Sequence, residues 1–184
     1  MIAKFIEDEI CYTGRELTSH WAYRRFGLLG DSIVAFRGPC DLPVERMADL
    51  EDILSDAPIH STRMLHFIVE HFGISLEISI LRQRLLICLI AEELNRDGAV
   101  RVIRRGDDLY SGEGKLSVSI AVQSPVSTMI HAGLNVVTEG TPVRTAGLSE
   151  LGVAPEGLAE EILVRYGEEI DGIARARCKV RGVP

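Results

Sequence analysis

The pattern of apolar and polar residues predicts two long helices. Apolar residues recur three or four positions apart over residues 74–95, and Gly98 follows as a stop signal. The recurring residues are Ile74, Ile78, Leu81, Leu85 and Cys88. Further leucines and isoleucines widen this apolar stripe, so the helix should be largely buried. A second helix, with apolar residues on one side and glutamates on the other, is predicted over residues 155–171.

Shorter apolar runs between turn residues predict a set of strands. The strands are expected at residues 1–6, 31–37, 63–72, 99–104, 115–123 and 127–138. Gly38-Pro39 is expected to end the second of them, and short helices are expected at residues 16–26 and 43–54. Helices stand between groups of strands instead of after each strand. This order predicts an α+β fold with a mainly antiparallel central sheet flanked by helices.

The strands at residues 115–123 and 127–138 are expected to form a hairpin with a three-residue turn. Every second residue of the first strand should pack in the core against every second residue of the next. These core residues are Leu116, Val118, Ile120 and Val122, with Thr128, Ile130, Ala132, Leu134 and Val136. The other face would pair Lys115 with Asn135, Ser117 with Gly133, and Ser119 with His131. Most of these side chains are short, so this face should leave room for a ligand.

Residues 104–116 are rich in charge and in glycine. Besides three glycines, the segment holds Arg104, Arg105, Asp107, Asp108 and Lys115. A lysine ammonium suits a phosphate or the developing charge of an acyl-adenylate, and a carboxylate can hold Mg²⁺ on phosphate oxygens. The segment is therefore expected to form a loop that meets an anion.

These residues resemble the core of a known enzyme family. Asp108 lies seven residues before Lys115, and Gly133-Leu134-Asn135-Val136 follows on the next strand. In biotin protein ligases, a Lys-Trp-Pro-Asn-Asp-type segment stands seven residues before an essential lysine, and a Gly-x-Gly-x-Asn-Val strand follows. The chain is thus similar to the catalytic domain of biotin and lipoate protein ligases, whose fold is shared with class II aminoacyl-tRNA synthetases.

The resemblance is clear over about residues 100–152. At its end, Thr141-Pro142 and residues 146–152 resemble the stretch that leads to the last helix of the ligases' catalytic domain. Three features depart from the family's pattern. Arg105-Gly106 replaces Trp-Pro, Val118 replaces the usual glycine after Lys-Leu-Ala, and no basic glycine-rich loop is visible. These departures leave open whether the substrate is biotin, lipoate or another small acid.

The resemblance implies a ligase-like reaction in which ATP and a small carboxylic acid form an acyl-adenylate for transfer to an acceptor. Lys115 would be catalytic and would contact the carboxyl group and the α-phosphate. Asp107 and Asp108 would take the Asn-Asp position, with Asp108 tied to ATP or its Mg²⁺. The further ATP-binding candidates are Arg37, Arg104, Arg105 and Asn135, and the substrate-binding candidates are Ser117, Ser119, His131 and Gly133.

Two other functions stay open. A non-catalytic binder of a small ligand or nucleotide would account for the departures at Arg105-Gly106 and Val118. An ATP-independent acyltransferase could use Cys40, since a thiol near Arg37 can have a lowered pKa. Neither a zinc site nor a Ser-His-Asp hydrolase is indicated, because the five histidines form no His-Glu-x-x-His pair and the chain has no Gly-x-Ser-x-Gly sequence.

Length and composition indicate one globular unit. A chain of 184 residues with 46% hydrophobic and 5% aromatic content should fold as a single catalytic-type domain, residues 1–184, with an aliphatic core. The net charge of −7 disfavours nucleic acid as a partner. The expected partners are a small carboxylic acid or a nucleotide. An acceptor protein and a homodimer are left open.

The sequence also bears on location. The four cysteines are widely separated, which indicates reduced thiols in a cytoplasmic protein. The most apolar segment, residues 85–91, is far shorter than the ~20 residues that cross a bilayer. Residues 1–10 already carry four charged side chains, so we expect neither a secretion signal nor a membrane span.

Overall fold

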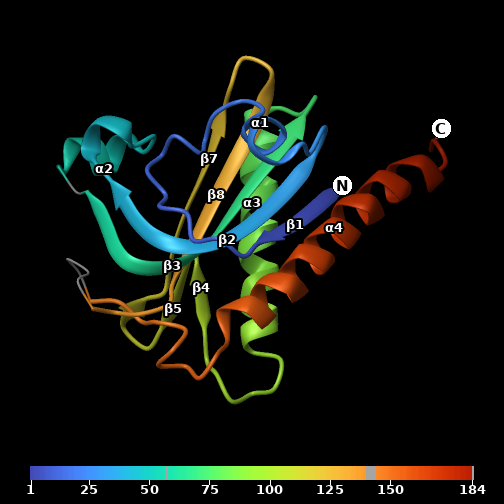
Figure 1. Cartoon of the computed structure of the whole chain (residues 1–184). Coiled ribbons are helices and arrows are strands. Elements are labelled where there is room, and N and C mark those ends of the chain that lie inside the picture. The colour runs from blue at the N-terminus through green and yellow to red at the C-terminus, as the bar shows by residue number, and fades with distance from the viewer. Residues whose placement is uncertain (57, 140–143, 184) are drawn as a thin grey trace.

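A five-stranded mixed sheet forms the centre of the computed structural model, which describes residues 1–56, 58–139 and 144–183. Its strands lie in the order β1-β2-β3-β8-β7. They span β1 (Ile2–Ile6), β2 (Ser32–Leu42), β3 (Ile59–Phe72), β7 (Ser117–Gln123) and β8 (Ser127–Asn135). Only β1 and β2 run parallel within this sheet. The predicted α+β fold with a mainly antiparallel sheet is confirmed (Figure 1).

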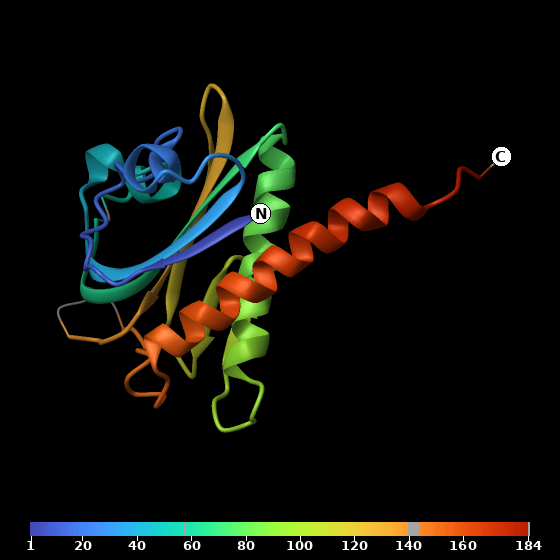
Figure 2. The same cartoon turned by 45° about the vertical axis from the view of Figure 1, so that its right-hand side comes forward.

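Two long helices cover one face of the sheet. The helix α3 (Leu76–Leu94) begins at Ser75, whose side chain accepts a hydrogen bond from the Ile78 N–H. The helix α4 (Pro155–Lys179) begins with a proline in its first turn, where the missing N–H costs nothing. Both predicted long helices are confirmed, and α4 runs on past residue 171 and extends beyond the sheet (Figure 2).

The helical face holds the larger core. It joins apolar side chains of α3 and α4 to alternate residues of β2, β3 and β8. These include Ile33, Leu65, Phe67, Leu86, Ile90, Ile130, Leu134 and Ile162, each with essentially no exposed surface. The opposite sheet residues pack in a second core.

The second core lies under the N-terminal segments. It contains Tyr12 and Trp21 together with Phe36, Met64 and Met129 from the sheet. The helix α1 (Trp21–Phe26), the short 3-10 helix η1 (Val44–Arg46) and the helix α2 (Leu50–Leu54) belong to this side. The strands β2, β3 and β8 are therefore buried on both faces, which explains their nearly continuous apolar sequences.

The two predicted short helices are only partly present. Residues 16–20 form turns, and α1 starts after His20, whose φ of 62° is left-handed. The predicted helix at 43–54 is divided between η1 and α2. The division follows from Asp49, which accepts hydrogen bonds from the N–H groups of Glu51 and Asp52 and starts α2 afresh.

The strand β2 does not end at Gly38-Pro39, contrary to expectation. It continues to Leu42 through a bulge between Gly38 and Cys40. Proline is tolerated at a bulge because the ladder is already interrupted there. The N-terminal segment pairs with this part of β2, as the Tyr12 N–H donates to the Pro39 carbonyl at 2.9 Å.

A second, three-stranded sheet is formed where a strand at residues 99–104 and a following loop were expected; the strand is present only from residue 103. The strands of this sheet are β4 (Ile103–Arg105), β5 (Asp108–Ser111) and β6 (Gly114–Lys115), all antiparallel. The predicted strand at 115–123 is thus divided at Leu116. Lys115 belongs to the small sheet, whereas the residues from Ser117 onward belong to the large one.

The predicted register of the β7–β8 hairpin is wrong by one residue. Gln123 pairs with Thr128, so Ser117 lies opposite Leu134 and Ser119 opposite Ala132. The turn spans residues 124–127 because Ser124 binds Ser127 through both its backbone N–H and its hydroxyl.

This shift changes which residues share a face, since side chains alternate along a strand. Val118 and Val122 pack with Met129 in the second core, and not with Ile130 and Leu134.

None of the helices in the described part of the chain has the length and hydropathy of a membrane-spanning segment.

Candidate functional site

Lys115 forms an ion pair with Asp108 on the adjacent strand of the small sheet. The Lys115 Nζ and the Asp108 Oδ2 lie 2.8 Å apart, and the two side chains are 34% and 22% exposed. The predicted seven-residue spacing thus brings the two charges together across β5 and β6. An ion pair of this kind fixes the ammonium in one position.

Negative groups lie close to the Lys115 ammonium. Burial favours the neutral form of Lys115, but hydrogen bonding to Asp108 and nearby negative groups outweigh it, and the pKa of Lys115 is raised. Burial also raises the pKa of Asp108, and the neighbouring carboxylates of Asp107 and Asp52 add to the rise against the opposing effect of Lys115. The two rises therefore have different main causes, which are hydrogen bonding and nearby negative charge for Lys115 and burial for Asp108.

Backbone hydrogen bonds hold Lys115 beside Asn135. The Asn135 side-chain amide donates to the Lys115 carbonyl at 3.2 Å, and the Asn135 N–H donates to the Leu116 carbonyl at 2.9 Å. The Ala146 N–H donates to the same Lys115 carbonyl at 3.0 Å. Gly114 permits this approach, because a Cβ there would lie 2.8 Å from the Ala146 nitrogen.

The small sheet has one mainly polar face, formed by Arg105, Asp108, Tyr110 and Lys115 together with the exposed Ile103, which pairs with Tyr110. Arg105 pairs with Asp108, and Tyr110 pairs with Lys115, and directly opposed residues point to the same side. The guanidinium of Arg105 lies 5.0 Å from the centre of the Tyr110 ring. Leu109 points the other way and is fully buried. The polar face therefore places two cations and one carboxylate around an aromatic ring.

Asp107, Ser117 and Ser119 attach the small sheet to the large one. The Asp107 carboxylate accepts a hydrogen bond from Gln83 of α3 at 3.0 Å, and its backbone carbonyl accepts one from the Ser119 hydroxyl. The Ser117 hydroxyl accepts a hydrogen bond from the Leu109 N–H at 2.9 Å. These hydrogen bonds thus hold the small sheet in place against the large sheet and α3. Contacts of these residues with a ligand stay a prediction.

Two of the predicted arginines lie elsewhere. Arg37 points to the helical side of the sheet, where its guanidinium pairs with Glu156 of α4 at 2.5 Å. Arg104 is exposed and donates to the carbonyl of Gly106. Neither is joined to Lys115 by any contact among the described residues. Thr141-Pro142 lies outside the described residues.

His131 and Gly133 face the second core, where an aromatic stack covers them. The rings of Tyr12 and His131 stack with centroids 3.7 Å apart, and the His131 Nε2 lies 3.0 Å from the His66 Nδ1. The His66 Nε2 faces the Gly38 carbonyl at 3.3 Å, so it carries the hydrogen and His66 accepts from His131. Burial lowers the pKa of His66 to about 4 and lowers that of His131 as well.

Sequence reasoning did not find Tyr12, His66 or Tyr110. The available signal for His66 was its position within a strand that is otherwise apolar, since a histidine there must find a polar partner. Tyr110 could have been found only from the strand pairing of the small sheet.

Cys40 is a poor nucleophile in this fold. Its side chain has no exposed surface, and burial together with nearby acidic groups raises the pKa of its thiol to about 12. The predicted effect of Arg37 on this thiol is wrong, because Arg37 is engaged with Glu156. No group of three or more His, Cys, Asp or Glu side chains in the described segments is placed to hold a metal ion.

A family model described as a domain of unknown function, DUF366, matches residues 1–181. The chain belongs to the DUF366 family. Among its relatives, the uncharacterized protein MJ0805 of Methanocaldococcus jannaschii is 42% identical over 178 residues, which cover 93% of this chain and 80% of MJ0805. A solved protein of unknown function from Pyrococcus horikoshi is 44% identical, with a TM-score of 0.94, 99% of this chain covered and 98% of that one.

Solved ligases share the fold of this DUF366 protein at low sequence identity. The biotin protein ligase from Aquifex aeolicus, in complex with biotin and ATP, matches 91% of this chain and 70% of its own, at 14% identity and a TM-score of 0.58. A lipoate-protein ligase A bound with ATP matches 92% and 85%, at 14% identity and a TM-score of 0.52. The predicted ligase-like fold is confirmed.

Proposed function

We propose that this DUF366 protein activates a small carboxylic acid with ATP and transfers the acyl group to an acceptor. The observation that carries the proposal is the Lys115–Asp108 ion pair beside the Asn135 amide. By the sequence resemblance these residues would take the positions of the ligase motifs, and the chain has a ligase-like fold. Lys115 is one of only three lysines in the chain, which otherwise uses arginine for its basic positions.

The polar face suits the charge changes of this reaction. A carboxylate oxygen of the acid attacks the α-phosphorus of ATP, pyrophosphate leaves, and negative charge develops on the phosphate oxygens. A fixed ammonium stabilises such charge best when it is already in position. The raised pKa keeps Lys115 protonated through the neutral range, and Asp108 keeps it in place.

The second half-reaction needs an acceptor nucleophile. Its lone pair attacks the acyl carbon, AMP leaves with the electrons of the broken bond, and the acceptor loses a proton to solvent. The ammonium of Lys115 would again face the phosphate oxygens of the leaving group. The proposal names only the chemical class of the acid and of the acceptor. The motif residues that would indicate a particular substrate are replaced at Arg105-Gly106 and Val118.

The residues of the site fit Mg²⁺ only together with phosphate. Asp108 is one carboxylate ligand, and Mg²⁺ commonly takes one or two carboxylates plus substrate phosphates. The carboxylates of Asp107 and Asp52 lie near Asp108, and this local negative charge favours an added cation when a polyanion enters. Mg²⁺ would supply charge neutralisation on the phosphates, and Asp108 would hold it.

Isotope exchange between pyrophosphate and ATP tests the proposal. We expect exchange that depends on one or more acids in a panel of small carboxylic acids, because adenylate formation is reversible. Lys115→Met should lower this exchange about 100- to 1000-fold, the usual cost of removing one positioned donor. Lys179→Met, at the exposed end of α4, is the matched control and should leave the rate unchanged. Equal exchange in both variants, or a folded protein inactive with every acid, would contradict the proposal.

A non-catalytic binder is the second candidate. The departures from the ligase pattern at Arg105-Gly106 and Val118 support it. Calorimetry would separate the two: a binder gives saturable heat with ATP and an acid but forms no AMP. Accumulation of AMP in step with acid consumption would remove this candidate.

A further inference from the structure

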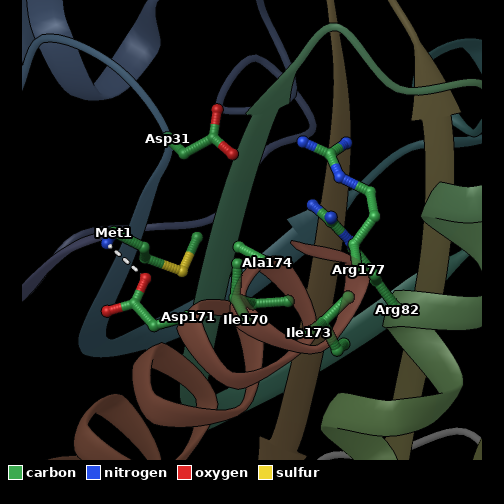
Figure 3. Close-up of a pocket in the computed structure, with 8 residues that line it drawn as sticks. All are labelled: Met1, Asp31, Arg82, Ile170, Asp171, Ile173, Ala174 and Arg177. Atoms are coloured by element: carbon green, nitrogen blue, oxygen red, sulfur yellow. Dashed lines mark hydrogen bonds and ion pairs between the residues drawn. The ribbon is translucent and has the colours of Figure 1, made fainter. Parts of the chain in front are cut away.

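A hollow lies on the helical side of the molecule. It has a volume of about 250 Å³ and lies between the start of β1, the residue before β2, and the helices α3 and α4 (Figure 3). Its walls are formed by Met1, Asp31, Arg82, Ile170, Asp171, Ile173, Ala174 and Arg177. None of the residues of the polar face contributes to it.

The carboxylates of this hollow are already engaged. The Asp31 carboxylate accepts a hydrogen bond from the Phe72 N–H at 2.9 Å and faces the His71 Nδ1 at 3.0 Å. The Asp171 carboxylate accepts from the Met1 nitrogen at 3.3 Å. Asp171 is thus neutralised by the N-terminal ammonium, and Asp31 is the one carboxylate left in the hollow to offset the two arginines.

The guanidinium groups are not so engaged. Arg177 makes no hydrogen bond or ion pair with any described residue, and Arg82 bonds only to the His71 Nδ1, at 2.9 Å. Both guanidinium groups extend into the hollow and face the Asp31 side of it (Figure 3). Two cations with unused donors in one small space form a place for an anion, although the whole chain carries a charge of −7.

We propose that Arg82 and Arg177 bind the carboxylate of a small organic acid in this hollow. The N–H donors of a guanidinium group can form two parallel hydrogen bonds with the oxygens of a carboxylate or a phosphate. The other side of the hollow is apolar, with Ile170, Ile173 and Ala174 on α4. A short hydrocarbon chain can bury itself against these residues, which favours an organic acid over inorganic phosphate.

Binding would also change a buried hydrogen-bond chain. The His71 Nδ1 faces both Asp31 and Arg82, and it cannot donate to the first and accept from the second at once. When the acid takes the donors of Arg82, the Nδ1 hydrogen is favoured and donates to Asp31. The His71 Nε2, which lies 2.9 Å from the Tyr166 hydroxyl of α4, then becomes the acceptor of that bond.

Titrations with butyrate, formate and inorganic phosphate test the site. We expect saturable binding with butyrate tighter than formate and phosphate, and at least a tenfold weaker butyrate affinity in Arg177→Gln. Arg177 is exposed and unpaired, so its replacement should not disturb folding. Arg175→Gln, earlier in α4 and outside the hollow, is the matched control and should bind as the unaltered protein does.

The ¹⁵N chemical shifts of His71 give a second readout. Butyrate should move the hydrogen to Nδ1 in the unaltered protein and not in Arg177→Gln. Both measurements are repeated in Lys115→Met, where binding at this hollow persists even if the polar face has lost its ligand. Phosphate binding more tightly than butyrate, or equal affinities in Arg177→Gln and Arg175→Gln, would overturn the proposal.

Discussion

Two histidines and Tyr12 stack at the middle of the sheet, where short side chains with free space above them were expected. His66 and His131 are buried, and each satisfies its neighbour as donor or acceptor. Their lowered pKa values show that both rings are neutral in the folded protein. A buried pair of neutral imidazoles makes stability depend on pH, because the unfolded chain ionises them more readily.

We predict a loss of stability in mild acid. A histidine in the unfolded chain titrates near 6.5, whereas His66 in the fold titrates at about 4. The free energy of unfolding should therefore be constant above about pH 6.5 and should fall as the pH drops towards 4, by about 3 kcal/mol from His66 alone. Urea unfolding between pH 7.5 and 4.5 measures this loss.

Two variants make this prediction specific. His131→Phe keeps a ring against Tyr12 but removes one titrating group, so its loss in acid should be smaller. His60→Gln, at an exposed position, should behave as the unaltered protein. An equal loss in both variants would show that the carboxylates, and not the imidazole pair, govern the acid response.

Single residues also mark how far the sequence could predict the site. The spacing of Asp108 and Lys115 led to two residues that form an ion pair. Asn135 lies beside Lys115 through the Lys115 backbone carbonyl, but the predicted pairing of Lys115 with Asn135 in the hairpin is wrong.

The faces of Ser117 and His131 could not be predicted, because both faces of β8 are buried and most residues of β7 are half-buried. Both registers would therefore bury apolar side chains. The buried polar side chains form hydrogen bonds, as the Ser117 hydroxyl does with the Leu109 N–H.

Among the elements, the long helix α3 was predictable in its extent, and its Ser75 cap agrees with the predicted start. Its buried face was not predicted correctly, because Ile78 and Leu81 of the predicted stripe are exposed, whereas Leu86 and Ile90 are buried.

The small sheet was not predictable, since each of its strands has four residues or fewer and shows no apolar alternation. The extent of β2 depends on a contact between distant segments. A Cβ at Gly38 would lie 2.0 Å from the Ile10 carbonyl oxygen, which no local pattern reveals.

We predict that Gly38→Ala is strongly destabilising. The added methyl group meets a backbone carbonyl that is itself held in place by its neighbours, so the free energy of unfolding should fall by about 3 kcal/mol. The matched control is Gly167→Ala within α4, where a Cβ meets nothing within 4 Å. It should raise stability by about 0.5–1 kcal/mol, because alanine is the better helix former. Denaturant titration of both variants measures the two changes, and a stable Gly38→Ala protein would contradict the close approach.

For the molecule as a whole, the sheet serves as the shared wall of two cores. Leu65 and Phe67 face the helices, whereas Met64 and Ile68 on the same strand face the N-terminal segments. Neither core can form without the strands that line the other. We therefore propose that the chain is a single cooperative domain, as its length and composition predicted.

Two spectroscopic probes test this proposal. Trp21 is the only tryptophan and lies in the second core, whereas the helical signal in circular dichroism comes mainly from α3 and α4 on the other face. The two unfolding transitions should coincide in urea, and Leu134→Ala in the larger core should shift both midpoints equally. Separate midpoints, with only the helical transition shifted, would show two independent units.

The central position of β3 also bears on how the protein is made. This strand of 14 residues pairs with β2 on one edge and with β8 on the other. A ribosome must synthesise all of residues 73–126 before β8 begins to emerge. Until then the nascent polypeptide presents one unpaired, strongly apolar edge, which is the kind of surface that chaperones recognise and that other unfinished chains can join.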